Sequence, residues 1–491
     1  MIESIGVELK AAGLPDVLGA VIAGDWVSAA GGTDAMDVED PATGDVVARF
    51  VPSPAGEVDA AVVDAHRAQT AWARRDPVER SRVLMRVSEA LRSNADVLAR
   101  LETIDSGKPL SQSKADIAVS ARYFEYYAGA IDKFGGETIP QPAGTFTYTT
   151  HEPLGVVAHI TPWNAPLSQM TRGVAPCLAA GNAVVVKPSE LTPLTTLLAA
   201  RLFIEAGLPA GLCNVVLGTG GSTGEALTNH PLVRHITFTG SVAAGRRVGA
   251  VAAERIIGLN LELGGKSPTI VCADADVESA ARAGALAVIR NSGQSCFATT
   301  RLLVDHAIHD RFVDLVAGHI AGLSLGHGLD DPDVGPLISA RQKEKVVATI
   351  EAAVADGAEI VVGGSTPNVL SGGHFVEPTL LRGVENGMPI ARQEVFGPVQ
   401  SVIAFDTLDQ AVEMANDTEY GLSAGVFTRD FARAHTLAAA LQAGQVQVNR
   451  YTGAGVEVPF GGYKNSGLGR EKGMEALRYY TQLKSVIMAT S

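Results

Sequence analysis

Short apolar runs alternate with helix-like stretches from Gly155 onward, and this alternation limits the fold more than any other feature of the sequence. The stretches between the runs place apolar residues at a spacing of three to four, as a helix does. Strands that are apolar on both faces and separated by helices are typical of a parallel sheet covered on both sides. The strand-like runs are GVVAHI, AVVVK, NVVLG and HITFTG, with a second series starting at PTIVCA. The sequence therefore predicts an α/β protein with two doubly wound α/β domains.

The chain on either side of these series has a different texture. Residues 57–130 are predicted to be helical, because their apolar residues recur at helical spacing. The stretch IPQPAGTFTYTTHEP, after Gly136, is rich in threonine, proline and aromatic residues, which favour strands with turns rather than a packed core. We expect this stretch to form an extended arm, and the final QLKSVIMAT to form a strand.

Composition and charge exclude several classes of protein. The chain has 491 residues, a formal net charge of −14 and a pI of about 5.3, and an acidic surface disfavours nonspecific nucleic-acid binding. No stretch reaches the ~20 apolar residues of a membrane span, and MIESIGVELKAAG lacks the apolar centre of a signal peptide. The four cysteines form no CxxC or Cys/His cluster with zinc spacing. We expect a cytoplasmic protein with no metal, membrane or nucleic-acid partner.

Two glycine-containing stretches are candidates for a phosphate-binding turn. GTGGSTG at 218–224 departs from the dinucleotide fingerprint, because Thr223 occupies the last glycine position, so a plain turn is an equal alternative. In FTGSVAAG at 238–245, a strand runs into a helix that begins near Gly240 and Ser241. Free N–H groups and a hydroxyl at a helix start can hold a pyrophosphate, although a simple N-cap would also explain Ser241.

Lys187 and Glu190 follow a buried strand in VVVKPSE. Pro188 turns the chain, so both side chains can face the crevice at the carboxyl edge of a parallel sheet. A lysine and a carboxylate suit the hydroxyls of a ribose, and a carboxylate repels a 2′-phosphate, which favours NAD over NADP. NADP stays open, because Lys187 can also hold a phosphate. The alternative is a solvated surface pair.

Cys296 differs from the other cysteines in its surroundings. It lies among small and polar residues in RNSGQSCFATTR, whereas the others lie in the apolar contexts VAPCLAA, GLCNVV and TIVCADA. An activated thiol needs access and nearby donors, and Gly293, Ser295 and the neighbouring amides supply both. Cys296 is therefore the candidate nucleophile, and the other cysteines are predicted to be packing residues.

Glu262 and Asn164 are further candidates for chemistry. Glu262 lies between two leucines in LELGGKSP, where desolvation would raise its pKa and suit it to general-base catalysis near neutral pH. The alternative is a structural carboxylate satisfied by backbone amides. Asn164 ends a strand in TPWNAP, where its amide can donate to a developing oxyanion or, as the alternative, cap the next helix.

The order of these motifs makes the chain resemble the aldehyde dehydrogenase superfamily from about residue 20 to near the C-terminus. The motifs are TPWNAP, KPSE, FTGS, LELGGKSP, GQSC, EVFGPV and PFGGYKNSGLGRE. The resemblance implies an NAD-binding domain (residues 1–133 and 153–264), a catalytic domain (265–477) and a β-strand oligomerisation arm (134–152 and 478–491). It also implies a homodimer or homotetramer.

The resemblance implies roles for particular residues. Cys296 resembles the nucleophile, Glu262 the general base and Asn164 the oxyanion donor. Glu394 resembles the contact to the nicotinamide ribose, and Phe396 the residue beside the nicotinamide end. The implied cofactor-binding residues are Ile160, Thr161, Pro162, Trp163, Lys187, Glu190, Gly220, Gly224, Phe238, Gly240, Ser241, Gly245, Leu263, Gly264, Glu394 and Phe396.

The implied reaction is the NAD-dependent oxidation of an aldehyde to a carboxylic acid. The Cys296 thiolate attacks the aldehyde, and Asn164 and the Cys296 N–H hold the resulting thiohemiacetal alkoxide. Hydride then passes to the nicotinamide, and Glu262 activates the water that hydrolyses the thioester. A CoA-acylating dehydrogenase is an alternative, although such enzymes do not need Glu262. A cofactor-free thiol hydrolase or a binding protein would leave KPSE, FTGS and the Cys, Glu and Asn set unexplained.

Two arginines bear on the substrate. Arg172 and Arg290 are placed as in succinate-semialdehyde dehydrogenases, which the chain resembles here and which use arginines to hold a distal carboxylate. The neighbourhood of Tyr451 departs from that pattern, and a structural role equally explains Arg290. We expect a polar aldehyde, with a carboxylate-bearing semialdehyde as one candidate and a simple aliphatic or aromatic aldehyde as the alternative. Tyr451 and Phe460 are the other expected substrate contacts.

Overall fold

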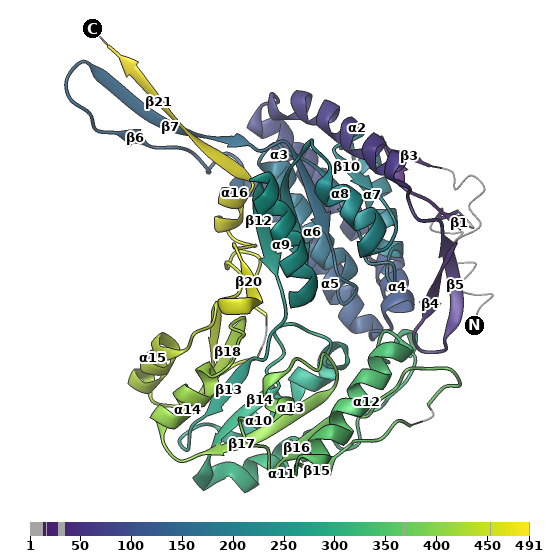
Figure 1. Cartoon of the computed structure of the whole chain (residues 1–491), viewed down its shortest axis with the longest axis vertical. Helices are drawn as coiled ribbons and strands as arrows, with labels where there is room; N and C mark the ends of the chain where they lie inside the picture. The colour runs from purple at the N-terminus through teal and green to yellow at the C-terminus, as the bar shows by residue number, and fades with distance from the viewer. Residues whose placement is uncertain (1–12, 16, 28–34, 368, 452, 491) are drawn as a thin grey trace.

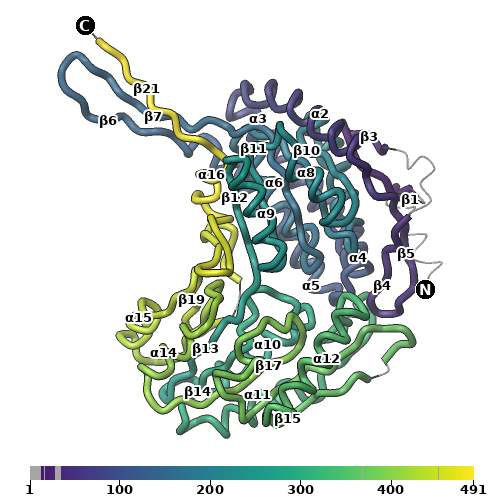
Figure 2. Tube along the Cα trace, viewed as in Figure 1, coloured from purple at the N-terminus to yellow at the C-terminus, as the bar shows by residue number. Residues whose placement is uncertain are grey.

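A computed structural model describes residues 13–15, 17–27, 35–367, 369–451 and 453–490. Figure 1 shows two lobes and an arm that projects from the first of them. The tube in Figure 2 follows the chain out of the first lobe after β12, through the second lobe, and back to the base of the arm. Two of the predicted architectural features, the α/β lobes and the arm, are therefore present.

A largely parallel sheet forms the centre of the first lobe. Its strand order is β20-β12-β11-β8-β9-β10-β2-β3, parallel from β12 to β10 and antiparallel at both edges. The strand order reverses between β8 and β11, which places a ligand crevice at the carboxyl ends of these two strands. The strands are β2 (Val21–Ile22), β3 (Asp25–Trp26), β8 (Val156–Ile160), β9 (Ala183–Lys187), β10 (Cys213–Val215), β11 (Val233–Thr239), β12 (Gly258–Glu262) and β20 (Gly467–Leu468).

Helices cover this sheet in two groups. One group contains α3–α7, in which α6 packs on β8 and β9, and the other contains α2, α8 and α9. The helices are α2 (Ala55–Ala73), α3 (Pro77–Ser93), α4 (Ala95–Ser106), α5 (Leu110–Ala130), α6 (Pro166–Ala179), α7 (Leu194–Glu205), α8 (Glu225–Asn229) and α9 (Val242–Arg255). β8 and β9 are buried along their whole length because helices lie on both faces. No helix in the described ranges is long and apolar enough to cross a bilayer.

The second lobe has its own parallel sheet, in the order β15-β16-β17-β14-β13-β18-β19, with β15 as an antiparallel edge. Its strands are β13 (Pro268–Val271), β14 (Arg301–Asp305), β15 (Glu359–Val362), β16 (Thr379–Arg382), β17 (Val399–Phe405), β18 (Ser423–Phe427) and β19 (Gln445–Val448). Its helices are α10 (Val277–Ile289), α11 (His309–Ile320), α12 (Ala340–Ala355), α13 (Pro389–Arg392), α14 (Leu408–Asn416) and α15 (Phe431–Ala440). Separate apolar clusters on its two faces make it a lobe with its own core.

A smaller sheet, in the order β1-β5-β4, lies at the edge of the first lobe (Figure 1). Its strands are β1 (Val17–Leu18), β4 (Met36–Asp40) and β5 (Asp45–Phe50). The arm is another small sheet, in the order β21-β7-β6, built from β6 (Thr138–Ile139), β7 (Thr145–Pro153) and β21 (Thr481–Ala489). The long antiparallel pair β7–β21 joins the two segments that the sequence assigns to the arm.

The structure divides the chain differently from the sequence at one boundary. The prediction assigns residues 265–477 to the catalytic domain, yet β20 pairs with β12 in the sheet of the first lobe. Val456, Leu477 and Tyr480 also belong to the apolar core of that lobe. The C-terminal segment therefore closes the first lobe, and α16 (Glu475–Tyr479) leads from it into the arm.

Candidate active site

A cavity of about 330 Å³ lies between the lobes, and Cys296 and Asn164 are in its wall. The first lobe contributes residues of α5 and α6, the second contributes the turn 290–297, and the segment 445–472, which returns from the second lobe to the first, completes the wall. The sequence predicted that these two side chains act together, and the structure places both on the same space. In the described part of the chain, no cluster of three or more His, Cys, Asp or Glu side chains is arranged to hold a metal ion.

Access distinguishes Cys296 from the other thiols. Cys296 is partly exposed to the cavity, whereas Cys177, Cys213 and Cys272 are buried. Acidity does not distinguish them: burial raises the pKa of Cys296 to about 12, opposed by the nearby Arg172 charge, and burial likewise raises the pKa of Cys272 to about 11. The resting Cys296 thiol is therefore protonated at neutral pH, and it needs a base or an added positive field to become a nucleophile.

Asn164 lies in the loop between β8 and α6, and its side chain does not cap the helix. The N-cap of α6 is Ala165, with no side-chain capping bond, so the capping alternative is wrong. The Asn164 side-chain amide donates to the carbonyl of Gln294 at 3.1 Å, and the Asn291 side chain donates to the Asn164 carbonyl at 2.8 Å. Asn164 is thus tied directly to the turn that carries the thiol.

Glu262 is the last residue of β12 and is only 2% exposed. Neither of its carboxylate oxygens has a hydrogen-bond partner among the described residues. Burial and the neighbouring Glu471 raise its pKa well above the usual range, against the opposing charges of Arg172 and Arg470. A buried carboxyl with no donor is not a structural carboxylate satisfied by backbone amides, but a group free to take up a proton.

Arg172 is already paired. Its guanidinium forms an ion pair with Glu471, and both side chains are almost fully buried. The predicted pair of substrate-binding arginines is therefore not present as two free cations. Sequence reasoning missed Glu471, although it stands in the GRE of a motif that the sequence analysis quoted.

Phe460 has cations near its ring. Arg172 lies 5.2 Å from the ring centroid, and the Lys472 ammonium lies 5.4 Å from it. Burial and the Arg172 charge lower the pKa of Lys472 to about 8. Phe460, Lys472 and Arg172 all line the cavity, so its wall is basic at this end.

Arg290 and Tyr451 stand on another part of the cavity wall. Arg290 is exposed, and none of the described Asp or Glu side chains forms an ion pair with it. Tyr451 is 5% exposed, and its ring lies 6.1 Å from that of Phe297. Burial raises the pKa of Tyr451, opposed by the Arg290 charge, so the phenol stays neutral beside a cation.

The residues predicted to bind a dinucleotide gather at the carboxyl ends of β8, β9, β11 and β12. Ile160 at the end of β8 pairs with Phe238 near the end of β11, and the Gly240 N–H donates to the Glu262 carbonyl at 3.0 Å. A Cβ on Gly240 would lie 2.6 Å from the Phe238 ring, and one on Gly245 would lie 2.5 Å from Leu263. Glycine is needed at both positions for α9 to start this close to the sheet. The remaining predicted members at these strand ends are Thr161, Pro162, Trp163, Ser241, Leu263 and Gly264.

Ser241 is the N-cap of α9, and its hydroxyl oxygen accepts from the Ala244 N–H at 3.3 Å. A hydroxyl that accepts keeps its own hydrogen for a second partner. The N-cap and phosphate-contact interpretations are therefore compatible. Gly220–Gly224 forms a short π-helical turn before α8, and Cβ atoms on Gly220 would meet open space, so this turn has room beside it.

Lys187 and Glu190 lie together at the end of β9. The Lys187 ammonium donates to the carbonyls of Pro188 and Gly218, at 2.6 and 2.8 Å, and lies 3.7 Å from Glu190. Burial lowers the pKa of Lys187, opposed by the Glu190 charge. Lys187 is only 2% exposed, whereas the Glu190 side chain is 35% exposed. The alternative of a solvated surface pair therefore does not fit Lys187.

Glu394 and Phe396 enter from the second lobe. The Glu394 carboxylate accepts from the Gly265 N–H at 2.9 Å, and burial raises its pKa. Phe396 has a positive φ of 57° and packs edge-on against Trp163 at 5.2 Å. A Cβ on Gly264 would lie 2.5 Å from the Glu394 carboxylate, so the glycine lets the two lobes meet here.

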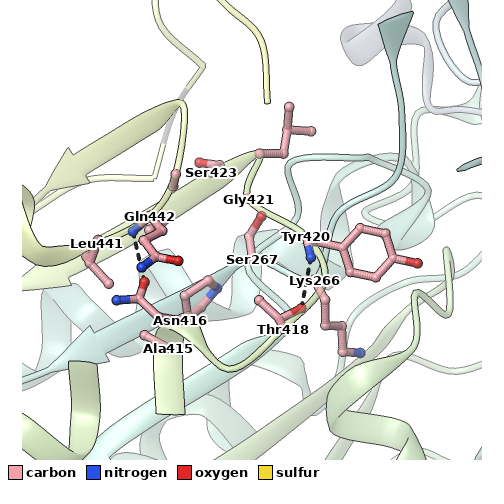
Figure 3. Close-up of a pocket in the computed structure, with 14 residues that line it drawn as sticks. Lys266, Ser267, Ala415, Asn416, Thr418, Tyr420, Gly421, Ser423, Leu441 and Gln442 are labelled. Carbon is pink, nitrogen blue, oxygen red and sulfur yellow. Dashed lines mark hydrogen bonds between the residues drawn. The ribbon is translucent and has the colours of Figure 1, made fainter. Parts of the chain in front are cut away.

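Lys266 lies beside this contact and lines a separate, much smaller cavity. Figure 3 shows it next to the hydrogen-bonded turn of Thr418 and Tyr420. The cavity has a volume of about 10 Å³, which is room for a single water molecule and not for a substrate. Burial and the Arg301 charge lower the pKa of Lys266 to about 7.

Known proteins resemble this chain along nearly its whole length. It matches the aldehyde dehydrogenase family over residues 26–486. It is 45% identical over 454 residues to a betaine aldehyde dehydrogenase of Mesorhizobium japonicum. The aligned region covers 92% of this chain and 93% of that relative.

Solved structures agree in fold. The indole-3-acetaldehyde dehydrogenase of P. syringae, in complex with NAD+ and IAA, superposes with a TM-score of 0.95 at 41% identity, over 98% of this chain and 99% of that one. The NAD+ complex of an aldehyde dehydrogenase from Bacillus cereus gives 0.94 at 39% identity, over 96% and 97%.

Proposed function

Because the chain belongs to the aldehyde dehydrogenase family, we propose that it oxidises a polar aldehyde to a carboxylic acid, with NAD as the hydride acceptor. One observation carries the mechanism: Cys296 alone among the cysteines opens on the cavity between the lobes, beside the Asn164 amide.

The Cys296 thiol loses its proton to solvent, and the thiolate then attacks the carbonyl carbon of the aldehyde and forms a thiohemiacetal alkoxide. The oxyanion that develops needs donors at the wall of the cavity. The Asn164 side-chain amide donates one N–H to the Gln294 carbonyl. A primary amide has two N–H groups, so the second would donate to the oxyanion. The backbone N–H of Cys296 is the other donor in this proposal.

The strand ends of the first lobe fit a dinucleotide. Lys187 and Glu190 would contact the adenosine ribose, and the start of α9, with Gly240 and Ser241, would face the pyrophosphate. Glu394 would hold the nicotinamide ribose. When bound, NAD accepts the hydride that leaves the thiohemiacetal carbon. The Glu190 carboxylate disfavours the 2′-phosphate of NADP.

Glu262 completes the reaction on the thioester left on Cys296. Its unpartnered oxygens accept a proton from water, and the water attacks the thioester carbon to release the carboxylic acid and the free thiol. Burial and the neighbouring Glu471 raise the pKa of Glu262, which strengthens its carboxylate as a base. If the acyl group were transferred from Cys296 to CoA, this buried, unpartnered carboxyl would have no role in the reaction.

The cavity charges favour a polar aldehyde with a negative group. No carboxylate among the described residues pairs with Arg290, and Lys472 adds a second cation at the other end of the wall. A quaternary ammonium, such as that of betaine aldehyde, needs a free aromatic face. Phe460 already has Arg172 and Lys472 near its ring, so the face of this one ring is not free for a cationic substrate. Arg290 rather than Arg172 is the proposed carboxylate contact.

The arm provides a surface for a second copy of the chain. β21 is an edge strand, and Leu483, Ile487 and Phe146 on the arm are 61%, 72% and 44% exposed. An edge strand carrying apolar side chains is a template for pairing with another chain. We expect a homo-oligomer, and Leu483→Glu with Ile487→Glu should yield smaller particles in light scattering, whereas Val63→Glu on α2 should not.

A panel of aldehydes tests the proposal. NADH formation is followed with neutral, carboxylate-bearing and quaternary ammonium aldehydes, with NAD or NADP, and with or without CoA. Arg290→Met should raise KM about tenfold for carboxylate-bearing aldehydes only, whereas Arg282→Met, on the exposed side of the same region, should raise it for none. No NADH with any aldehyde would refute the activity, and an acyl-CoA product would refute the hydrolytic step.

A further inference from the structure

The turn that presents Cys296 has an unusual backbone. Asn291, Ser292 and Gly293 are all left-handed, with φ of 47°, 53° and 71°. Residues other than glycine rarely occupy this region because their Cβ clashes with the backbone, so the surrounding contacts must hold such a turn. The turn ends α10 and leads directly through Gln294 to the thiol.

Contacts from the second lobe fix part of this turn. The Ser292 hydroxyl donates to the Gly335 carbonyl at 2.7 Å, and the Gln294 side chain accepts from the Ile338 N–H at 2.9 Å. Gly293 packs so closely on Gly397 that a Cβ would lie 2.1 Å from its carbonyl oxygen. These contacts leave the first strained residue, Asn291, to be held from elsewhere.

Asn291 is held from the first lobe. Its backbone N–H donates to the Gln112 side-chain oxygen at 2.8 Å, and its own side chain donates to the carbonyls of Asn164 and Gln294, at 2.8 and 3.2 Å. Gln112 stands in the first turn of α5 and lines the same cavity as Cys296. Asn291 therefore connects α5, the proposed oxyanion donor Asn164 and the turn that carries the thiol.

We propose that Gln112 is a positioning residue for the nucleophile. Its side-chain oxygen holds Asn291 in the left-handed conformation, and Asn291 in turn sets Cys296 and Asn164 relative to each other. The inference rests on the proposed role of Cys296. Sub-ångström errors in such a geometry change rates by large factors, so loss of this acceptor should slow the thiol's reaction without changing how the aldehyde binds.

The test separates an acceptor from a substrate contact. Gln112→Met keeps the side-chain length and removes the acceptor, Gln112→Asn keeps an amide that is too short to reach, and Gln112→Glu keeps an oxygen at the same reach. Lys114→Met is the matched control, because Lys114 is on the same helix and its ammonium pairs with the exposed Asp96 at 3.2 Å. Each variant is measured for kcat, for aldehyde KM and for the rate at which iodoacetamide alkylates Cys296, read by peptide mass spectrometry.

We expect Gln112→Met and Gln112→Asn to lower both kcat and the alkylation rate about tenfold to a hundredfold, with KM within about threefold. Gln112→Glu should recover most of both rates, and Lys114→Met should match the unaltered protein. A rise in KM with an unchanged alkylation rate would show that Gln112 only contacts substrate and would overturn the proposal. Equal losses in the Glu and Met variants would overturn it too. Because alkylation needs no aldehyde, it reports on Gln112 even if the proposed activity fails.

Discussion

Arg172 and Glu471 form a buried ion pair in the wall of the cavity that contains Cys296. The pair brings one charge of each sign close to the thiol and to Glu262, and the Arg172 charge favours the ionised form of both groups. Breaking one partner of a buried pair leaves the other charge uncompensated, at a cost of about 3–5 kcal/mol.

The first prediction concerns this pair. Glu471→Gln and Arg172→Met should each lower the free energy of unfolding by about 3–5 kcal/mol. The double variant should lose much less than the sum of the two, because neither charge is then left alone. Urea unfolding measures all three. If Arg172 instead served the substrate, Arg172→Met would raise KM for carboxylate-bearing aldehydes and leave stability nearly unchanged.

The second prediction concerns the nucleophile. Cys296→Ser should lower kcat by at least about a thousandfold, because serine lacks the thiol's nucleophilicity at this site. Cys272→Ser is the control, since that thiol directly follows β13, is buried, and is not among the residues that line the cavity of Cys296. The control should retain kcat, and equal loss in both variants would remove Cys296 from its proposed role.

The third prediction concerns pH. Burial raises the pKa of Cys296 to about 12 and the pKa of Glu262 well above its usual range, and both groups act only after losing a proton. The value of kcat/KM should therefore rise with pH across roughly pH 6–9. Lys472 is among the cations that favour ionised Glu262, so Lys472→Met should move the rise to higher pH. A profile that falls across this range would contradict the assignment.

The fourth prediction concerns Glu262 and stability. Its pKa is raised in the folded state, so the fold favours the protonated form, and this stabilisation is present below about pH 4.3 and is lost as pH rises toward the folded pKa. Glu262→Gln stays neutral at every pH. The variant should have a higher Tm than the unaltered protein at pH 7, by a few degrees, and a smaller advantage at pH 4. It should also produce one burst of NADH followed by slow turnover, because thioester hydrolysis is impaired.

The fifth prediction concerns cofactor choice. Glu190→Gln removes the charge that repels a 2′-phosphate while keeping the side-chain shape. The ratio of kcat/KM for NADP to that for NAD should rise about tenfold, which corresponds to about 1.4 kcal/mol. Glu205→Gln, on an exposed ion pair of α7, is the control and should leave the ratio unchanged. An unchanged ratio in Glu190→Gln would show that discrimination lies elsewhere.

The sequence predicted the α/β architecture well, because buried parallel strands such as β8 and β9 are apolar throughout and are easily recognised. The resemblance to aldehyde dehydrogenases is confirmed over residues 26–486. Cys296 and Asn164, which the sequence predicted to act together, line one cavity. The roles proposed for the catalytic and cofactor-binding residues stay predictions, to be tested as above.

Contacts between residues far apart in the chain could not be predicted from the sequence. The ion pair between Arg172 and Glu471 joins residues that no local sequence pattern relates. Because Arg172 is paired, it is not the free cation that was expected to bind a substrate carboxylate. The bond from Asn291 to Gln112 spans 179 positions and involves a glutamine with no motif around it. The assignment of β20 to the first sheet was missed because a two-residue strand carries almost no periodic signal.

The strand β20 also affects how the protein is made. It completes the edge of β12, yet it is synthesised only after every strand of the second lobe. While the second lobe is still being synthesised on the ribosome, the first lobe therefore has an unpaired edge at β12. Such an edge invites association between neighbouring chains, so premature termination should yield aggregates rather than a soluble nucleotide-binding fragment.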